Sequence, residues 1–366
     1  MNKYSFNKIT LVQYIFIISE TQIGIGVLSL PSDLAKSAGS DGWLSILLGW
    51  ILCILASLFV IQIMDKNPGY TLIEILSAYF GKWMGRGLSV LWILYTAFAA
   101  SVAMFSTIFI IKLWIIPDMQ DFILMVLFLV PIYMVAKQGI RIIGVSAELI
   151  FLVSIWMPFF LLFTLKDVHW LFLLPVAKEG LLPILSTVKS TVFSFLGFEL
   201  AFILYPFLKD KKSASKGIVI ANSLSMIIFV SVTVICYIKF SPDEIKDYAY
   251  PTLNLLKGIR LPFLERLEIT FLSFYLLILF ITVIPYLYTT VLGISQLCGK
   301  QDHRNVLRIF IGLLILSSFF FSPSSSQVTR LGVMWGQIGT CFAYVFPVCL
   351  WIYGRLFQLV RKGQVQ

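Results

Sequence analysis

The chain has 366 residues, of which 59% are hydrophobic and only 13% are charged, and its mean hydropathy is +0.93. This small number of charged side chains cannot cover the surface of a soluble protein. The composition therefore predicts an integral membrane protein. The formal net charge of +10 does not indicate nucleic-acid binding, because the basic residues are scattered in short loops and form no continuous patch with stacking aromatic rings.

Ten apolar runs are long enough to cross the membrane, each having the roughly 20 residues that a hydrocarbon core requires. In chain order they are 9–31, 42–64, 87–112, 119–136, 142–165, 184–208, 217–240, 267–290, 306–322 and 331–354. The first run lacks a small-residue cleavage site and is expected to be retained as a span. An interfacial helix is expected over 72–80, ending at Gly81, and helical pieces are expected in a loop over 241–265.

The basic residues indicate which side of the membrane each loop faces. If the N-terminus is cytoplasmic, most of the 28 Lys and Arg residues fall in cytoplasmic loops, and most acidic residues fall outside. The segment KDKKSASK at 209–216 is the strongest retention signal, and the 241–265 loop is expected to be external. An even number of spans then places both termini in the cytoplasm.

The spans divide into two halves of five, about 9–165 and about 184–354, within one transmembrane domain over 1–366. An odd number of spans per half predicts an inverted repeat, in which the first span of each half corresponds. Both of these spans are interrupted: SETQIGIGVLSLP and TVFSFLGFELAFILYP each combine glycine, hydroxyl groups and one acid, and each ends in proline. Paired interruptions predict a midplane binding site, because unwound backbone exposes N–H and C=O groups. The alternative is that Gly24 and Gly26 only permit close helix packing.

Glu20 and Glu199 are the only charged residues placed deep in a span by this assignment. An acid at that depth costs about 2.5–3.5 kcal/mol on insertion scales, so it normally faces a cavity, a cation or a hydrogen-bond partner. Glu20 is therefore a candidate ion or proton site; the alternative is a protonated or amide-paired carboxyl that stabilises the broken backbone. Thr289 and Thr290 in span eight are candidates for the same ion path, or they stabilise the helix.

The remaining polar chemistry gives no sign of an enzyme, and no cofactor or metal is expected. The chain has no intramembrane histidine, no cluster of metal ligands and no nucleophile–base pair at a recognisable spacing. The five cysteines show no CxxC spacing and are expected to be reduced packing residues: Cys53, Cys236, Cys298, Cys341 and Cys349.

Four motifs in this order carry a resemblance that covers essentially the whole chain: GIGVLSLP, TLIEILSAYFGKWMGRGL, GFELAFILYPFL and YPTLNLLKGIRLPFLERLEI. Together they resemble the B subunits of bacterial spore-germination nutrient receptors, in the amino acid–polyamine–organocation superfamily. The resemblance implies an all-α integral membrane fold of the leucine-transporter type, with ten spans and with spans one and six broken. It implies a small nutrient held between spans one, three, six, eight and ten. It also implies two partners in the spore inner membrane, a larger A subunit and a lipoprotein C subunit.

The resemblance and the interruptions together give the candidate ligand-binding residues. They lie in the first break, in the facing wall of span three and in the second break: Thr21, Gln22, Gly24, Ile25, Gly26, Val27, Tyr95, Phe98, Phe195, Gly197 and Glu199. Packing is the alternative role for Tyr95 and Phe98. If the ligand is an amino acid, backbone N–H groups at the half-helix starts suit its carboxylate, and free carbonyls or Glu199 suit its ammonium.

We therefore expect a receptor subunit, surrounded by membrane lipid, that binds a germinant and signals to its partner subunits. The alternative is an amino acid transporter coupled to protons or sodium. Span five has no lysine that could replace a bound cation, which weakens one proton-coupling arrangement but leaves coupling through Glu20 open. No feature of the sequence identifies the germinant.

Overall fold

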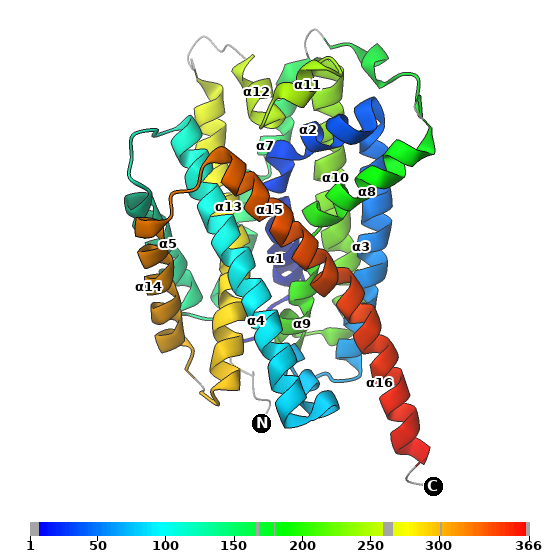
Figure 1. Cartoon of the computed structure of the whole chain (residues 1–366), viewed down its shortest axis with the longest axis vertical. Coiled ribbons are helices and arrows are strands. Elements are labelled where there is room, and N and C mark those ends of the chain that lie inside the picture. The colour runs from blue at the N-terminus through cyan, green and yellow to red at the C-terminus, as the bar shows by residue number, and fades with distance from the viewer. Residues whose placement is uncertain (1–6, 166–167, 179, 259–265, 301, 364–366) are drawn as a thin grey trace.

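Each apolar run forms one helix or a pair of helices in the computed structural model, which describes residues 7–165, 168–178, 180–258, 266–300 and 302–363 (Figure 1). The helices that correspond to the ten predicted spans are α1–α2 (Leu11–Ile23 and Gly26–Ala38), α3 (Gly42–Asp65), α4 (Leu72–Trp114), α5 (Asp121–Ala136), α6–α7 (Ile140–Ser154 and Met157–Phe160), α8–α9 (Leu181–Ser194 and Ala201–Leu204), α10 (Ala214–Lys239), α13 (Leu267–Leu297), α14 (Arg304–Phe320) and α15–α16 (Ser325–Thr340 and Phe346–Gly363). Among the described residues, six helical segments are by length and composition apolar enough to cross a membrane, and the bent pair formed by Leu181–Ser194 and Phe198–Phe207 makes a seventh. The chain is therefore an all-helical integral membrane protein, while the repeat bounds 9–165 and 184–354 stay a prediction.

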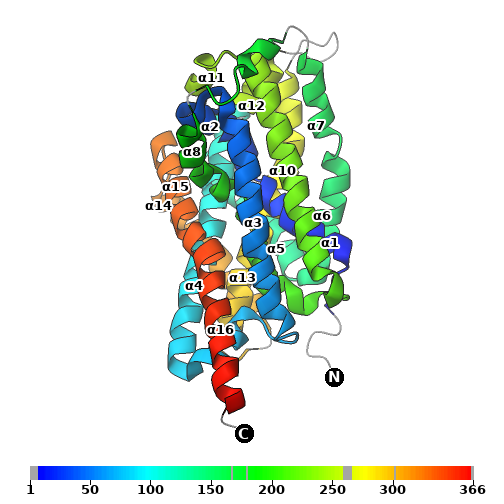
Figure 2. The same ribbon diagram turned by 90° about the vertical axis from the view of Figure 1, so that its right-hand side faces the viewer.

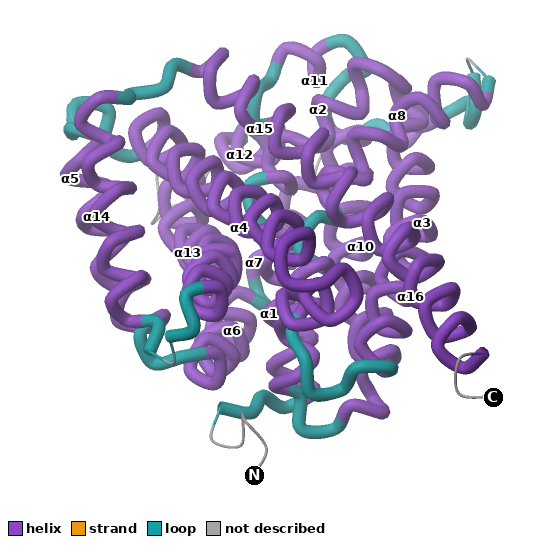
Figure 3. The backbone as a smooth tube through the Cα atoms, turned by 60° about the horizontal axis from the view of Figure 1, so that its bottom comes forward, coloured by secondary structure: helices purple, strands orange, loops and turns teal. Residues whose placement is uncertain are grey.

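Both termini lie at the same end of the bundle (Figures 1 and 2). We call this end the inner end, because the sequence predicts that it faces the cytoplasm, and the opposite end the outer end. Two short helices, α11 (Glu244–Asp247) and α12 (Pro251–Lys257), lie at the outer end and belong to the loop predicted to be external. The last part of that loop, 259–265, lies outside the described residues. The connecting loops gather at the two ends of the bundle (Figure 3).

The predicted interfacial helix is the first part of α4. Thr71 and Glu74 form a capping box at its start, in which the Thr71 N–H donates to Glu74 Oε2 at 2.9 Å. Gly81 then adopts φ 76° and ψ 178°, a conformation that favours glycine, so the chain turns there before span three begins. The prediction of a short helix that ends at Gly81 is confirmed.

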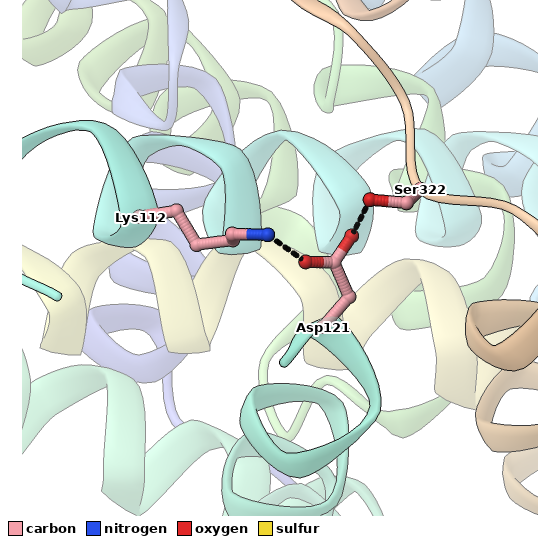
Figure 4. A network of polar contacts seen from close by, with 3 residues as sticks. All are labelled: Lys112, Asp121 and Ser322. Atoms are coloured by element: carbon pink, nitrogen blue, oxygen red, sulfur yellow. Dashed lines mark hydrogen bonds and ion pairs between the residues drawn. The ribbon is translucent and has the colours of Figure 1, made fainter. Parts of the chain in front are cut away.

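Near the outer end, one buried carboxylate connects three segments (Figure 4). Asp121, at the start of α5, accepts from Lys112 Nζ of α4 at 2.5 Å and from Ser322 Oγ at 2.5 Å. Ser322 belongs to the link between α14 and α15. Because a carboxylate in the first turn of a helix also interacts favourably with the helix dipole, Asp121 fixes the relative positions of α4, α5 and this link.

All five cysteines are free, as expected. Cys53 and Cys236 are buried packing residues. The other three side chains, those of Cys298, Cys341 and Cys349, are exposed, so the expectation that they are packing residues is wrong.

The expectation that Pro31 ends span one is wrong, because α2 continues through Pro31 to Ala38. Proline has no N–H, so it cannot bond the carbonyl of Val27 four residues earlier. Thr252 Oγ1 of α12 donates to this carbonyl at 2.9 Å. A hydroxyl from the outer loop thus replaces the missing helical hydrogen bond, and α2 continues.

We predict that Thr252→Val destabilises the full chain by about 1 kcal/mol, because the substitution keeps the shape of the side chain but leaves the Val27 carbonyl unpaired. The measurement is thermal unfolding of the purified protein in detergent. In a Pro31→Ala background the helix restores its own bond to Val27, so Thr252→Val should cost clearly less there. Equal costs in the two backgrounds would contradict this account of the bond.

Candidate ligand-binding site

The first break lies between α1 and α2, at Gly24 and Ile25. The carbonyls of Ile23 and Gly24 accept from the hydroxyl of Tyr275 in α13, at 3.0 and 2.6 Å. Thr282 of α13 donates to the carbonyl of Glu20 at 3.1 Å. A Cβ at Gly24 would lie only 2.8 Å from Thr282 Cγ2, so the close approach of α13 requires a glycine here. The break is narrower than the predicted Gly24–Val27, because the helix resumes at Gly26.

The start of α2 presents backbone donors. Within the described part of the chain, the N–H groups of Ile25, Gly26 and Val27 donate to no acceptor. A Cβ at Gly26 would meet Ser194 Oγ of α8 at 3.5 Å, an ordinary contact distance. The outer halves of the two broken spans therefore face each other here without crowding.

The second break lies between α8 and α9, and its backbone accepts a hydrogen bond from a side chain of α1. Gly197 has φ 129°, and a Cβ on it would lie 3.1 Å from Thr21 Cγ2, so α1 packs directly against this glycine. Gln22 Nε2 donates to the carbonyl of Phe195 at 2.9 Å and to Asn222 Oδ1 of α10 at 2.9 Å. The sequence predicted two breaks at one depth, and the structure places them side by side.

Glu199 follows the second break, in a 3-10 turn over Phe198–Leu200, and is fully buried. Its Oε1 accepts from the hydroxyls of Tyr95 and Tyr286, at 2.6 and 2.8 Å, and its Oε2 accepts from the Gly197 N–H at 2.7 Å. These three donors use all but one of the roughly four lone-pair sites of a carboxylate. Glu199 therefore connects α4, α13 and the second break, and retains little capacity for a ligand.

The wall formed by α15 and α16 was not assigned residue by residue from the sequence. A Cβ at Gly336 would lie 2.4 Å from the ring of Phe193, and a Cβ at Gly339 would lie 2.4 Å from Leu196. The next turn, Cys341–Val345, is a π-helix whose Phe342 stacks on Tyr95 with ring centroids 4.9 Å apart. Glycines at helical spacing in GVMWGQIGT were the available signal for this contact.

The inner halves of the broken spans are joined by the backbone itself. The Ile9 N–H donates to the Phe207 carbonyl at 2.9 Å, and the Lys209 N–H donates to the Ile9 carbonyl at 3.0 Å. Gln13 Nε2 adds a bond to Glu148 Oε2 of α6 at 3.2 Å. The start of α1 is therefore fixed to the end of span six and to span five.

Several candidate residues do not join the breaks. Phe98 is half-buried and takes no part in the described side-chain hydrogen bonds or ring contacts. Thr290 donates to Thr96 of α4 at 2.9 Å, and Thr289 is buried beside it on α13.

Glu20 lies one turn before the first break and is 1% exposed. Its Oε2 has no hydrogen-bond partner among the residues that the structure describes. It is therefore the one carboxylate at the breaks that retains an unused oxygen in this part of the chain.

Two broken helices whose breaks meet inside a membrane-spanning bundle define the leucine-transporter fold. The chain aligns with the structure of MhsT in complex with L-phenylalanine at a TM-score of 0.62 and 14% identity, and the alignment covers 94% of this chain and 88% of that one. It aligns with Mhp1, a nucleobase-cation-symport-1 family transporter, at a TM-score of 0.59 and 11% identity, and the alignment covers 93% of this chain and 79% of Mhp1. Both structures are of leucine-transporter-fold transporters.

The chain belongs to the spore germination protein family, whose model matches residues 8–326. Spore germination protein GerQB of Bacillus cereus is 27% identical over 92% of this chain and 93% of its own. Spore germination protein YndE of Bacillus subtilis is 29% identical over 95% of this chain and 97% of its own. The relatives and structural neighbours are germination proteins and transporters rather than enzymes.

We predict that Gly24→Ala and Gly26→Ala affect stability differently. The added methyl at Gly24 overlaps Thr282, which costs about 1–3 kcal/mol in a packed interior, whereas the methyl at Gly26 has room. Thermal unfolding of the two variants in detergent measures the difference. Thr282→Ser removes the nearer clashing atom and should recover part of the loss in Gly24→Ala. Equal destabilisation by both alanines would show that the first break is not arranged as described.

Proposed function

We propose that this chain is the B subunit of a spore germination receptor, that it binds an amino acid germinant between the two helix breaks, and that it signals occupancy to a larger A subunit and a lipoprotein C subunit. The proposal includes the spore inner membrane as its location, with both termini cytoplasmic. Its main support is the group of three backbone N–H donors at Ile25, Gly26 and Val27, which lack acceptors in the described structure. The structural neighbour MhsT was solved in complex with L-phenylalanine, and this supports an amino acid as the class of ligand.

The proposed ligand would lie with its carboxylate at the start of α2. Free N–H groups and the positive end of the helix dipole favour an anion there. The ammonium would lie toward the second break, where Glu199 has one acceptor position left. The neighbouring carbonyls of Ile23 and Gly24 already accept from Tyr275, so the ammonium has few other acceptors.

The first test is a germination assay with spores in which Gly26→Ala replaces the native chain. The nutrient is first identified by comparing spores with and without the chain against single amino acids, sugars and nucleosides. We expect Gly26→Ala to raise the half-maximal nutrient concentration about tenfold, equivalent to roughly 1.4 kcal/mol, because the methyl narrows the space between α2 and α8. Gly26→Leu should abolish the response.

The matched control is Gly312→Ala in α14, where a Cβ would meet no atom within 4 Å. It should leave the nutrient response unchanged. Immunoblots should show normal amounts of this chain and of its partner subunits in every strain. If Gly26→Ala lowers protein and response together, with an unchanged half-maximal concentration, the glycine serves packing and the site assignment fails.

The unpartnered Oε2 of Glu20 favours a second candidate function, amino acid transport coupled to protons or sodium. The full chain in liposomes should then accumulate labelled amino acid when a proton or sodium gradient is imposed. Glu20→Gln should abolish accumulation, whereas Glu268→Gln, a buried glutamate that pairs only with Arg266 in the described structure, should not. Binding without accumulation by the native chain would eliminate transport and leave the receptor.

A further inference from the structure

A cavity lies at the inner end, away from the helix breaks. It has a volume of about 900 Å³ and lies between the start of α4, the end of α13 and the start of α14. Basic side chains from two distant segments reach it: Lys82 and Arg86 from α4, and Lys300 from the loop after α13. We call this cavity the basic cleft.

The three basic side chains of the cleft, those of Lys82, Arg86 and Lys300, have no acidic partner among the residues that the structure describes. Glu74 is the only acidic residue of the described lining, and its carboxylate already accepts from Thr71 in the capping box. Three like charges around one cavity repel one another, so an anion in the cleft would be stabilised.

The residues next to Lys82 place this part of the cleft at membrane-interface depth. Trp83 is 86% exposed and Met84 is 62% exposed, and both directly follow Lys82 in the chain. An exposed tryptophan at the end of a span is typical of the headgroup region of a bilayer. Trp83 therefore supports a position of Lys82 and Arg86 at headgroup level, at the end of the bundle predicted to face the cytoplasm.

We propose that the basic cleft binds the phosphodiester headgroup of an anionic phospholipid, such as phosphatidylglycerol. The cleft lies between membrane-spanning helices and its basic side chains sit at headgroup depth, which is the arrangement by which transmembrane proteins bind anionic lipids. Polar groups of Ser77 and Asn7 add hydrogen-bonding capacity to its lining. Free phosphate shares the headgroup chemistry, but it would not account for the exposed apolar side chains beside the cleft.

The test uses the full chain, purified in detergent and stripped of lipid, and counts bound lipids by native mass spectrometry. The native chain should bind phosphatidylglycerol at least about tenfold more tightly than phosphatidylcholine, given three basic contacts. Replacing Lys82, Arg86 and Lys300 together by Gln should remove this preference. Single variants from opposite walls, Lys82→Gln and Lys300→Gln, should each weaken it and serve if the triple variant does not fold.

A charge-matched control separates the cleft from general attraction to the inner end. Replacing Lys209, Lys212 and Lys216 by Gln removes the same charge from exposed positions at the same end but outside the cleft. This control should retain the lipid preference. The proposal is overturned if the cleft variant keeps the preference for phosphatidylglycerol as fully as the control does. It is also overturned if the control loses that preference as fully as the cleft variant does.

Two further results would reassign the cleft. Inorganic phosphate at millimolar concentration should neither bind the lipid-free chain in calorimetry nor displace phosphatidylglycerol; if it does both, the ligand is free phosphate. If lipid binding is unchanged in the cleft variant but the partner subunits no longer copurify, the cleft binds an acidic protein segment instead. Either result overturns the assignment to a lipid.

Discussion

Two helices that break inside a membrane leave backbone polar groups that lipid cannot satisfy, and each unpaired group costs several kcal/mol. In this chain the two breaks lie side by side, so side chains from neighbouring spans reach the freed groups of both. Tyr275 bonds the carbonyls of Ile23 and Gly24, and Gln22 bonds the carbonyl of Phe195. The packing of α1, α8 and α13 at one depth follows from this requirement.

The compensation is one-sided. The freed carbonyls of Ile23, Gly24 and Phe195 each accept a hydrogen bond, and the Glu199 carboxylate accepts three. The N–H groups at the start of α2, in contrast, have no acceptor in the described structure. A site with spare donors is completed by an anionic or carbonyl-bearing group. The wall of α15 packs closely on the second broken span, because Gly336 faces Phe193 and Gly339 faces Leu196.

The local features of the fold were predictable from the sequence, whereas the bonds between distant segments were not. Glycines, acids and prolines interrupt apolar runs visibly, so both breaks and the turn at Gly81 could be located. Tyr275 and Tyr286 bond residues far away in the chain, and nothing near them distinguishes them from other buried tyrosines. Pro31 was misread for the same reason, because the hydroxyl that lets α2 continue comes from Thr252.

The two halves of each broken span differ in how firmly they are fixed. The inner halves are joined by backbone bonds between Ile9 and the end of span six. The described residues show no hydrogen bond between the outer halves, and a Cβ added at Gly26 would find room beside Ser194; α2 is bonded to the outer loop through Thr252. The proposed ligand would bond the half that is joined to the outer loop rather than to the other broken span. A ligand shifts an equilibrium only through contacts that differ between two states, so the proposed receptor function requires that the start of α2 and the α12 helix bonded to it differ between the empty and the occupied protein.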